Sequence, residues 1–492
     1  MSTGKNKNTS YYMWSAISIL LMFGFGIIVK PFAGITEVGI VVLGVFFGVL
    51  VATIATNETF WPAIMGLFAL IVGGFATGSQ MLSQWFGNPT IQQIIWVMAL
   101  TGAVTESGAV HVLGRKVLSV KSLQGRPIRL ISTLFFGVMF CAVLVSSPTT
   151  MLLLFYPILD GICDMCGVEK DSDLKRELLL GIYIAAMGAY VLPFKGVHLS
   201  SIAIISGIME SVGLTFNNGL YLLVSTLVVI GFVVIYILFM LFVWKTDLSP
   251  LKEFQYDKLG LKEEDLKFTT KQKVLFGFML FGILFLLSSM LMPAGSAILA
   301  AYNRIGSTWI WVFLFAVLCV VREPDGKPFI DGVKLLQSKT MWGIVAVAGC
   351  FTICGSAIAA DDYGIKFAIS ELLAPVLSNA SWPLLVILCV VISTVFTNFT
   401  NGMPVSFTIN AICIPIACTM QLNGGGNATI LGVATILSGM CAFMTNGAIA
   451  YAPILIGREE MTTKFLFSKG AVTNGIFIFA CSALCIIFGY IL

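Results

Sequence analysis

The chain has 492 residues, of which 58% are hydrophobic and only 11% are charged. Soluble domains carry roughly 25% charged residues, so this composition excludes a soluble globular protein and indicates an integral membrane protein. The formal net charge of +4 does not indicate nucleic-acid binding, because the basic residues lie in short loops between apolar runs.

Apolar runs follow one another along the chain, and a membrane-spanning helix needs about 20 such residues. The first run lacks a small-residue cleavage site, so we expect it to be retained as a span. Nine runs predict single spans: 14–29, 38–56, 60–78, 89–105, 219–243, 273–292, 307–321, 341–360 and 470–490. Four longer regions are interrupted by Gly, Pro, Ser, Thr and Asn, and they predict hairpins or broken helices: 128–163, 178–209, 383–420 and 428–457.

Two of these regions carry the same kind of polar interruption. Residues 145–150 read Val-Ser-Ser-Pro-Thr-Thr, and residues 397–404 read Thr-Asn-Phe-Thr-Asn-Gly-Met-Pro. Inside a bilayer, backbone is left without helical pairing only where protein covers it or where it lines a wet cavity. Because the two clusters occupy matching points of the two halves, they predict re-entrant hairpins whose tips form a transport site.

Helix ends at such tips have partial charges: the N-terminal N–H groups suit an anion, and the C-terminal carbonyls suit a cation. Hydroxyl and amide side chains near the tips and breaks are the candidate substrate ligands: Ser147, Thr149, Thr150, Thr400, Asn401 and Thr445. The alternative is that these side chains only connect helices to each other.

Lys195 is a further candidate for binding the substrate. It lies in the break Leu192-Pro193-Phe194-Lys195-Gly196, with apolar sequence on both sides. A charge at the bilayer centre costs at least about 2.5–3.5 kcal/mol, so Lys195 is expected to face the substrate or a charged partner. The alternative is a lysine near a helix end that reaches the interface. His198 is a possible proton site or, equally, a hydrogen-bonded structural residue.

The two halves share an order of elements, which predicts two inverted repeats. The predicted division is 1–88 as N-terminal scaffold helices, 89–244 as the first repeat, 245–272 as a cytoplasmic linker, 273–339 as scaffold helices and 340–492 as the second repeat. With the N-terminus in the cytoplasm, all but four of the 28 Lys and Arg residues lie in inside loops. Lys30, Arg304 and Lys366 lie outside and Lys195 within the membrane, a distribution that follows the positive-inside rule.

Missing motifs narrow the functional class. The sequence contains no GxxxxGK[ST] and no HExxH, and it has only two histidines, so neither an ATPase nor another enzyme is expected. Cys163 and Cys166 have no second pair and no histidine nearby, so they are interpreted as buried apolar residues.

The order of hairpin, broken span, charged linker and second copy resembles the divalent-anion/sodium symporter family of the ion-transporter superfamily over roughly residues 35–490. That family carries a Ser-Asn-Thr triplet at each hairpin tip, ten residues before a proline. Here Ser147-Pro148-Thr149 precedes Pro157 by that spacing, with Pro148 in place of the Asn. The second tip, Thr400-Asn401-Gly402, is of similar type, and the breaks appear as Pro193–Gly196 and Thr445–Gly447.

The resemblance implies two sodium sites and a homodimer. The first sodium site would hold Ser147, Thr149 and Gly196, and the second Thr400, Asn401, Asn446 and Gly447. Thr149 and Asn401 would face the anion. Because the first tip lacks the Asn, we hypothesise that Lys195 either replaces that sodium ion with a fixed ammonium group or pairs with a substrate carboxylate.

The sequence therefore predicts an all-α polytopic membrane protein with about eleven transmembrane helices, two inverted repeats, two re-entrant hairpins and two broken helices. The expected location is the plasma membrane, with the N-terminus in the cytoplasm. The expected function is sodium-coupled secondary transport of a small organic anion, a di- or tricarboxylate, by elevator-type alternating access. A proton-coupled or uncoupled carrier of the same fold and an anion channel are the alternatives.

Overall fold

The structure is a computed structural model, and it describes residues 3–56, 58–109, 112, 116, 123–144, 148–193, 198–255, 267–288, 292, 296–365, 367–368, 371, 381–399, 402–445 and 451–491. Within these ranges the regular structure is helical, and the β-pairing is limited to an isolated bridge between Arg322 and Pro328. The all-helical fold predicted from the sequence is confirmed.

The N-terminal part forms a layered group of helices. Its members are α1 (Thr3–Ile28), α2 (Glu37–Thr56), α3 (Phe60–Val72), α4 (Gly78–Phe86) and α5 (Pro89–Glu106). α1 packs along α2, which packs on α3. Exposed apolar side chains such as Leu20 and Ile27 cover much of α1, as expected for a helix in contact with lipid.

The next part of the chain contains the first hairpin and the first broken span. Its elements are α7 (Pro127–Leu144), α8 (Pro148–Met165), α9 (Asp173–Ala185), the 3-10 helix η2 (Ala186–Tyr190), α10 (Leu199–Ser211), α11 (Asn218–Leu238), the π-helical turn η3 (Phe239–Val243) and the 3-10 helix η4 (Ser249–Glu253).

The C-terminal part repeats this order after four further helices. Its elements are α12 (Thr270–Ser288), α13 (Ala297–Val320), α14 (Gly332–Lys339), α15 (Trp342–Ala359), η8 (Asp361–Tyr363), α17 (Trp382–Phe399), α18 (Gly402–Leu422), α19 (Ala428–Gly439), α20 (Ala452–Ile456), α21 (Thr463–Phe465), η9 (Leu466–Gly470) and α22 (Ala471–Ile491). Thus α17 and α18 form the second hairpin, and α19 and α20 form the second broken span.

Side-chain caps explain where many of these helices begin. The first N–H groups of a helix have no helical acceptor, and a Ser, Asn or Asp side chain placed just before the helix supplies one. Such caps are made by Ser172 for α9, Asn217 for α11, Ser296 for α13, Asp331 for α14 and Asn427 for α19.

Each of the four interrupted regions contains two helices, as predicted, and each of the nine apolar runs contains one. Seven described helices are long and apolar enough to cross a membrane, or up to nine if each of two bent pairs is one span. The described residues also include three shorter apolar helices, α3, α10 and α19. The helix predicted over 307–321 is longer than expected, because α13 begins at Ala297 and bends at Gly306.

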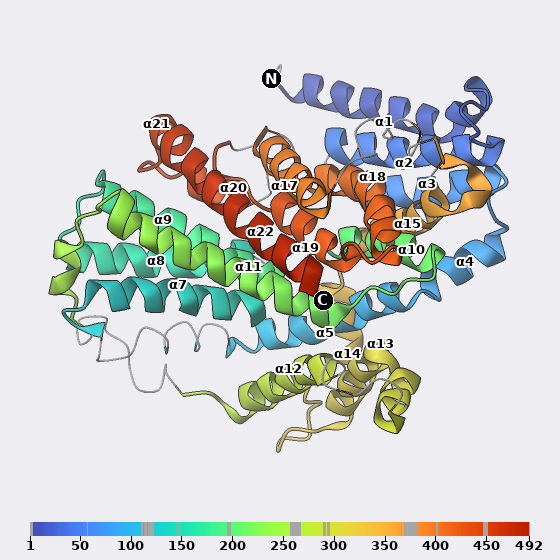
Figure 1. The fold of residues 1–492 in the computed structure, drawn as a ribbon. Helices are drawn as coiled ribbons and strands as arrows, with labels where there is room; N and C mark the ends of the chain where they lie inside the picture. The colour runs from blue at the N-terminus through green and yellow to red at the C-terminus, as the bar shows by residue number, and fades with distance from the viewer. Residues whose placement is uncertain are drawn as a thin grey trace.

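The two broken spans lie at the centre of the molecule, where α10 and α19 pack against each other (Figure 1). Every residue of α19 is buried. Each hairpin contacts both spans: α7 packs on η2 and α8 on α20, while α17 packs on α19 and α18 on α10. This crossed packing brings the two halves together around the breaks.

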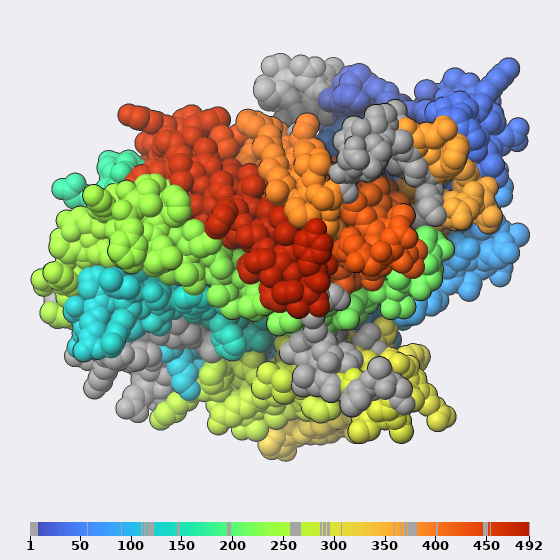
Figure 2. Space-filling view, viewed as in Figure 1, coloured from blue at the N-terminus to red at the C-terminus, as the bar shows by residue number. Residues whose placement is uncertain are grey.

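Apolar side chains cover the outer surface, as membrane insertion requires. Figure 2 shows α22, in dark red, running across the viewed face, and Phe479 and Ile487 of this helix are exposed. The exposed apolar surface and the long helices together indicate that the protein is integral to the membrane.

Candidate functional site

Four of the predicted site residues are described: Thr149, Thr150, His198 and Thr445. The others lie outside the described residues, and their roles remain predictions; these are Ser147, Lys195, Gly196, Thr400, Asn401, Asn446 and Gly447. The flanks of both tips and both breaks are described, and they define the surroundings of the site.

The tip of the second hairpin lies against the C-terminal end of α19. Gly402 begins α18, and a Cβ atom at this position would lie 1.8 Å from the carbonyl oxygen of Gly439. A residue without a side chain is therefore required where the two backbones meet. α19 has 12 residues and is about 18 Å long, which is shorter than a hydrocarbon core about 30 Å thick.

Asn398, close to this tip, organises the second break. Its side-chain oxygen accepts hydrogen bonds from the N–H groups of Phe443 (2.9 Å) and Met444 (3.1 Å). Its main-chain carbonyl accepts a short hydrogen bond from the hydroxyl of Thr445. These backbone groups follow the end of α19 and have lost their helical partners, so one hairpin residue satisfies the polar groups of the break.

The amide nitrogen of Asn398 is also bonded. It donates to the Thr394 carbonyl at 2.8 Å and to Oδ1 of Asn474, on α22, at 3.2 Å. Asn398 is 2% exposed. The sequence analysis selected Thr400 and Asn401 and not Asn398. Their positions in the sequence could have identified Asn398 as well. Asn398 is still within the apolar helix, where a polar side chain has to find a partner.

Three hydroxyl groups on α17 lie near Asn398 without hydrogen-bond partners among the described residues. They belong to Ser393, Thr394 and Thr397, all of which are fully buried. Threonine and serine within a helix usually bond to a carbonyl one turn earlier, and a buried hydroxyl without a partner is unfavourable. The three hydroxyls therefore keep unused hydrogen-bonding capacity among the described residues.

At the first break the groups that need partners are carbonyls, and side-chain hydroxyls donate hydrogen bonds to them. The Tyr190 carbonyl accepts from the Tyr221 hydroxyl at 3.0 Å, and the Val191 carbonyl accepts from the Ser225 hydroxyl at 3.0 Å. Both donors lie on α11. These carbonyls end the first half of the broken span, so α11 takes the place of the missing helical turn.

His198 supplies the third contact of this kind. Its Nε2 lies 2.9 Å from the Leu192 carbonyl oxygen, and since a carbonyl only accepts, Nε2 carries the hydrogen. The ring is fully buried, edge-on to Tyr190 and parallel to Tyr221. This contact supports the structural alternative for His198, and a role as a proton site remains a prediction.

Aromatic rings connect the two breaks. Tyr451, which follows the second break, lies with its ring centroid 5.0 Å from that of Tyr183 and 6.3 Å from that of Tyr190. Its hydroxyl donates to the Met440 carbonyl at 3.1 Å, as Tyr221 does at the first break. The flanks of the two breaks are therefore in direct contact.

A chain of small polar side chains makes a second connection between the halves. Ser201 on α10 is hydrogen-bonded to Ser406 on α18 at 2.9 Å, and Asn410 donates to Ser406 at 3.2 Å. The Thr435 hydroxyl on α19 donates to Asn410. All four residues are fully buried. The predicted alternative, hydroxyl groups that connect helices, applies to these residues.

Four charged side chains form a closed ring that fastens the first hairpin to the second half. Lys175 of α9 lies 3.1 Å from both Asp160 of α8 and Glu460. Arg458 lies 2.8 Å from Asp160 and 3.0 Å from Glu460, with its guanidinium over the Tyr156 ring. Each cation thus contacts both anions. The sequence analysis placed Lys175 and Arg458 in loops and did not predict the ring, because pairs about 300 positions apart leave no local pattern.

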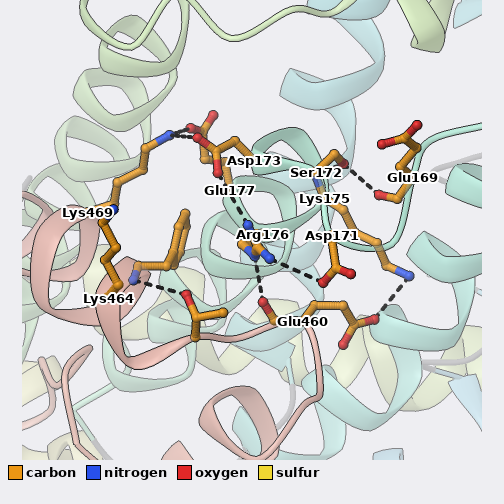
Figure 3. A network of polar contacts seen from close by, with 12 residues as sticks. Glu169, Asp171, Ser172, Asp173, Lys175, Arg176, Glu177, Glu460, Lys464 and Lys469 are labelled. Carbon is orange, nitrogen blue, oxygen red and sulfur yellow. Dashed lines mark hydrogen bonds and ion pairs between the residues drawn. The ribbon is translucent and has the colours of Figure 1, made fainter.

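The charges continue from this ring along α9. Figure 3 shows Lys469 directed at Asp173 and Glu177, and Arg176 between Asp171 and Glu460. Burial alone would raise the pKa of Glu460, but hydrogen bonds from Arg458, its own N–H and Lys175 outweigh burial and lower the pKa to about 2. The Glu460 carboxylate is therefore ionised throughout the physiological range.

The variant Asn398→Ala is expected to destabilise the backbone at the second break. It leaves the N–H groups of Phe443 and Met444 without an acceptor, at a cost of about 1–3 kcal/mol for each buried group. Hydrogen exchange followed by mass spectrometry should show faster exchange at 443–444 and a lower melting temperature. The exposed Asn423→Ala is the control. Exchange at the break that equals the wild-type rate would contradict the role of Asn398.

The variant Glu460→Gln is expected to flatten the acid limb of the stability profile. The folded-state pKa of about 2 lies below the unfolded value near 4.3, so Glu460 stabilises the fold above about pH 4.3, and this stabilisation is lost as the pH falls towards 2. The melting temperature of the variant should be lower at pH 7 and should change less between pH 5 and pH 3. Glu459→Gln, an exposed neighbour, should behave like the wild type.

Known proteins agree with this architecture. Residues 49–438 match the family model described as "Citrate transporter" (CitMHS). Among solved structures, Neisseria gonorrhoeae MtrF, described within a class of antimetabolite efflux pumps, is similar with a TM-score of 0.57 at 14% identity, covering 86% of this chain and 85% of that one. The Alcanivorax borkumensis YdaH transporter is similar with a TM-score of 0.53 at 13% identity, covering 86% and 88%. No curated protein sequence matches.

Identities this low show a common fold alone, whereas the family match covers most of the chain. The long apolar helices, the exposed apolar surface and the family match together show that the chain is an integral membrane transporter that belongs to the citrate transporter family.

Proposed function

We propose that the protein is a secondary active transporter of citrate or a closely related di- or tricarboxylate, driven by sodium. The observation that carries this proposal is the arrangement around Asn398, a residue of the second hairpin whose side chain accepts hydrogen bonds from the backbone that follows the end of α19. Irregular backbone at this depth is typical of transport sites.

Helix ends around the tips suit an anionic solute. α8 begins at Pro148 beside the first tip, and α18 begins at Gly402 beside the second. Both helices therefore direct N-terminal N–H groups and a partial positive charge towards the tips. Thr149, half-buried in the first turn of α8, and Thr445 at the second break add hydroxyl groups that can donate to carboxylates.

Sodium is a hard cation that prefers oxygen ligands, and the second half offers them. The hydroxyls of Ser393, Thr394 and Thr397, which have no partner among the described residues, supply oxygen atoms on α17, the helix that also carries Asn398. This supports a sodium site of the kind found in the divalent-anion/sodium symporters, with Thr400, Asn401, Asn446 and Gly447 as further ligands. At the first site, Ser147, Thr149 and Gly196 are the proposed ligands, and Lys195 supplies either the missing positive charge or a carboxylate contact.

The proposed movement is an elevator-type displacement of the hairpins and broken spans as one body. The crossed packing of hairpins on breaks and the ring around Lys175 support a rigid moving unit. Residues 1–88 and 273–339 are the proposed scaffold. We further propose that the repeats are inverted, and that the protein is a homodimer in the plasma membrane with a cytoplasmic N-terminus.

Two alternatives remain in the same fold. The first is a proton-coupled or uncoupled carrier, in which Lys195 or His198 would titrate. The second is an anion channel, which would conduct without coupling to sodium or protons. Uptake driven by a pH gradient without sodium would identify the first, and flux that neither saturates nor runs uphill would identify the second.

The proposal is tested by citrate uptake into proteoliposomes that contain the purified protein. An inward sodium gradient should drive accumulation above the external concentration, and replacing sodium with potassium should abolish it. Lys195→Ala should lower uptake by at least about tenfold, since loss of the proposed contact with a carboxylate would cost about 2 kcal/mol or more. The dependence of uptake on sodium concentration should also change.

Lys195→Arg is the matched variant, because it keeps the charge. It should retain more uptake than Lys195→Ala. Unchanged uptake together with an unchanged sodium dependence in Lys195→Ala would eliminate the proposed role of this residue.

A further inference from the structure

We propose that the cavity between the ends of α5, α12 and α14 and the loop after α13 binds the phosphate headgroup of an anionic phospholipid on the proposed cytoplasmic side of the membrane. The cavity has a volume of about 610 Å³. α12, α13 and α14, which belong to the proposed scaffold, lie together on one side of the molecule (Figure 1). The site concerns the lipid around the protein, and it does not depend on which solute is transported.

Ion pairs bring the helix ends together at this cavity. Lys271, in the first turn of α12, lies 2.6 Å from Glu323, which follows the end of α13. Lys339, the last residue of α14, lies 3.2 Å from Glu106, the last residue of α5. The apolar sequence of α12 begins just after Lys271, at 274, and that of α13 ends just before Glu323, at 321. The cavity therefore lies where two apolar helices reach the water boundary.

The wall of the cavity combines free positive charge with acids that already have partners. Three lysines line it: Lys271, Lys327 and Lys334. The two acids in the wall are both engaged, since Glu106 is paired with Lys339 and Asp331 accepts a hydrogen bond from the N–H of Lys334 at 3.0 Å as the N-cap of α14. A negative group entering the cavity would therefore meet no unpaired carboxylate among its described residues.

Basic residues also outnumber acidic residues around the cavity. Residues 267–339 contain eight basic and three acidic residues, and every basic residue except Arg304 lies at or next to a helix end that borders the cavity. Lys271 and Lys327 each have one acidic partner, whereas the ammonium group of Lys334 has none among the described residues. Basic residues next to membrane spans attract anionic lipids, so this surplus favours a phosphate headgroup.

Exposed apolar side chains lead from this basic region along the helices. On α12, Leu280 and Leu284 follow Lys273 by seven and eleven residues, a spacing that places all three on one exposed face of the helix. On α13, Phe313 and Val320 are likewise seven residues apart and exposed. A phospholipid has a charged head and apolar chains, and this surface matches both parts. A soluble anion would leave the apolar part unused.

The exposure of the lysines fits a ligand that arrives from the membrane surface. A headgroup lies at the boundary with water, so the lysines that bind it need long apolar stems and accessible ammonium groups. Lys271 shows this arrangement, because its ammonium group lies 5.4 Å from the centre of the buried Phe329 ring, which also lines the cavity. A bound lipid would connect α5 with α12 and α14, which are far apart in the sequence.

The site is tested by melting-temperature titrations of the purified protein in a neutral detergent, with either phosphatidylglycerol or phosphatidylcholine added. Phosphatidylglycerol should raise the melting temperature saturably, because a ligand of the folded state stabilises it, and phosphatidylcholine should have a much smaller effect. Lys334→Gln should raise the half-maximal concentration of phosphatidylglycerol about fivefold, since a basic residue near anionic lipid contributes about 1 kcal/mol. The double variant Lys327→Gln/Lys334→Gln should raise it further.

Lys252→Gln, in η4, removes the same charge at another exposed position and should titrate like the wild type. Lys334→Arg keeps the charge and should also titrate like the wild type. Equal responses to the two lipids, a wild-type titration in the double variant, or an equal effect of soluble glycerol phosphate would overturn the inference. Citrate uptake is a separate measurement, so failure of this site and failure of the proposed function can be told apart.

Discussion

Backbone groups exposed at the two helix breaks have to be hydrogen-bonded inside the membrane, and the arrangement of the site follows from how this chain achieves it. The first break retains carbonyl groups, which Tyr221, Ser225 and His198 satisfy. The second break retains N–H groups, which Asn398 satisfies. Because each unsatisfied group would cost about 1–3 kcal/mol, these side chains are what allow the breaks to persist.

The same contacts hold the two halves together. Asn398 connects a hairpin to a broken span, Ser201 and Ser406 connect the first broken span to the second hairpin, and Tyr451 contacts both breaks. At one end of this assembly, the ring of Lys175, Arg458, Asp160 and Glu460 fixes the first hairpin to the segment after α20. Contacts of this kind are what the proposed movement as one body requires.

Local features of the structure were predictable from the sequence. The helices and their interruptions follow from apolar runs and from Gly, Pro, Ser and Asn, so the nine runs and the four interrupted regions were all found. The bend at Gly306 was missed, although Gly306-Ser307-Thr308 is a polar interruption of the same kind. Gly306 lies directly before the predicted run 307–321 and was therefore not included in it.

Contacts between distant residues were not predictable. Nothing in the sequence near Asn398 shows that Phe443 and Met444 need an acceptor, since that need arises only when α19 ends beside the hairpin. The charge ring joins Asp160 to Arg458, which are 298 positions apart, and the periodicity of a single sequence carries no information about such pairs. The family match shows that the chain is a transporter, whereas the sequence motifs alone gave only a resemblance to a transporter family.

The central claim is that citrate binds where the hairpin tips meet the two breaks. Hydrogen exchange of the protein in nanodiscs, with and without citrate in sodium buffer, tests it most directly. The account predicts slower exchange on citrate addition in peptides that cover 144–150, 190–198, 396–404 and 440–451, with little change in α1 or α12. Protection confined to other parts of the chain, at citrate concentrations that saturate uptake, would contradict it.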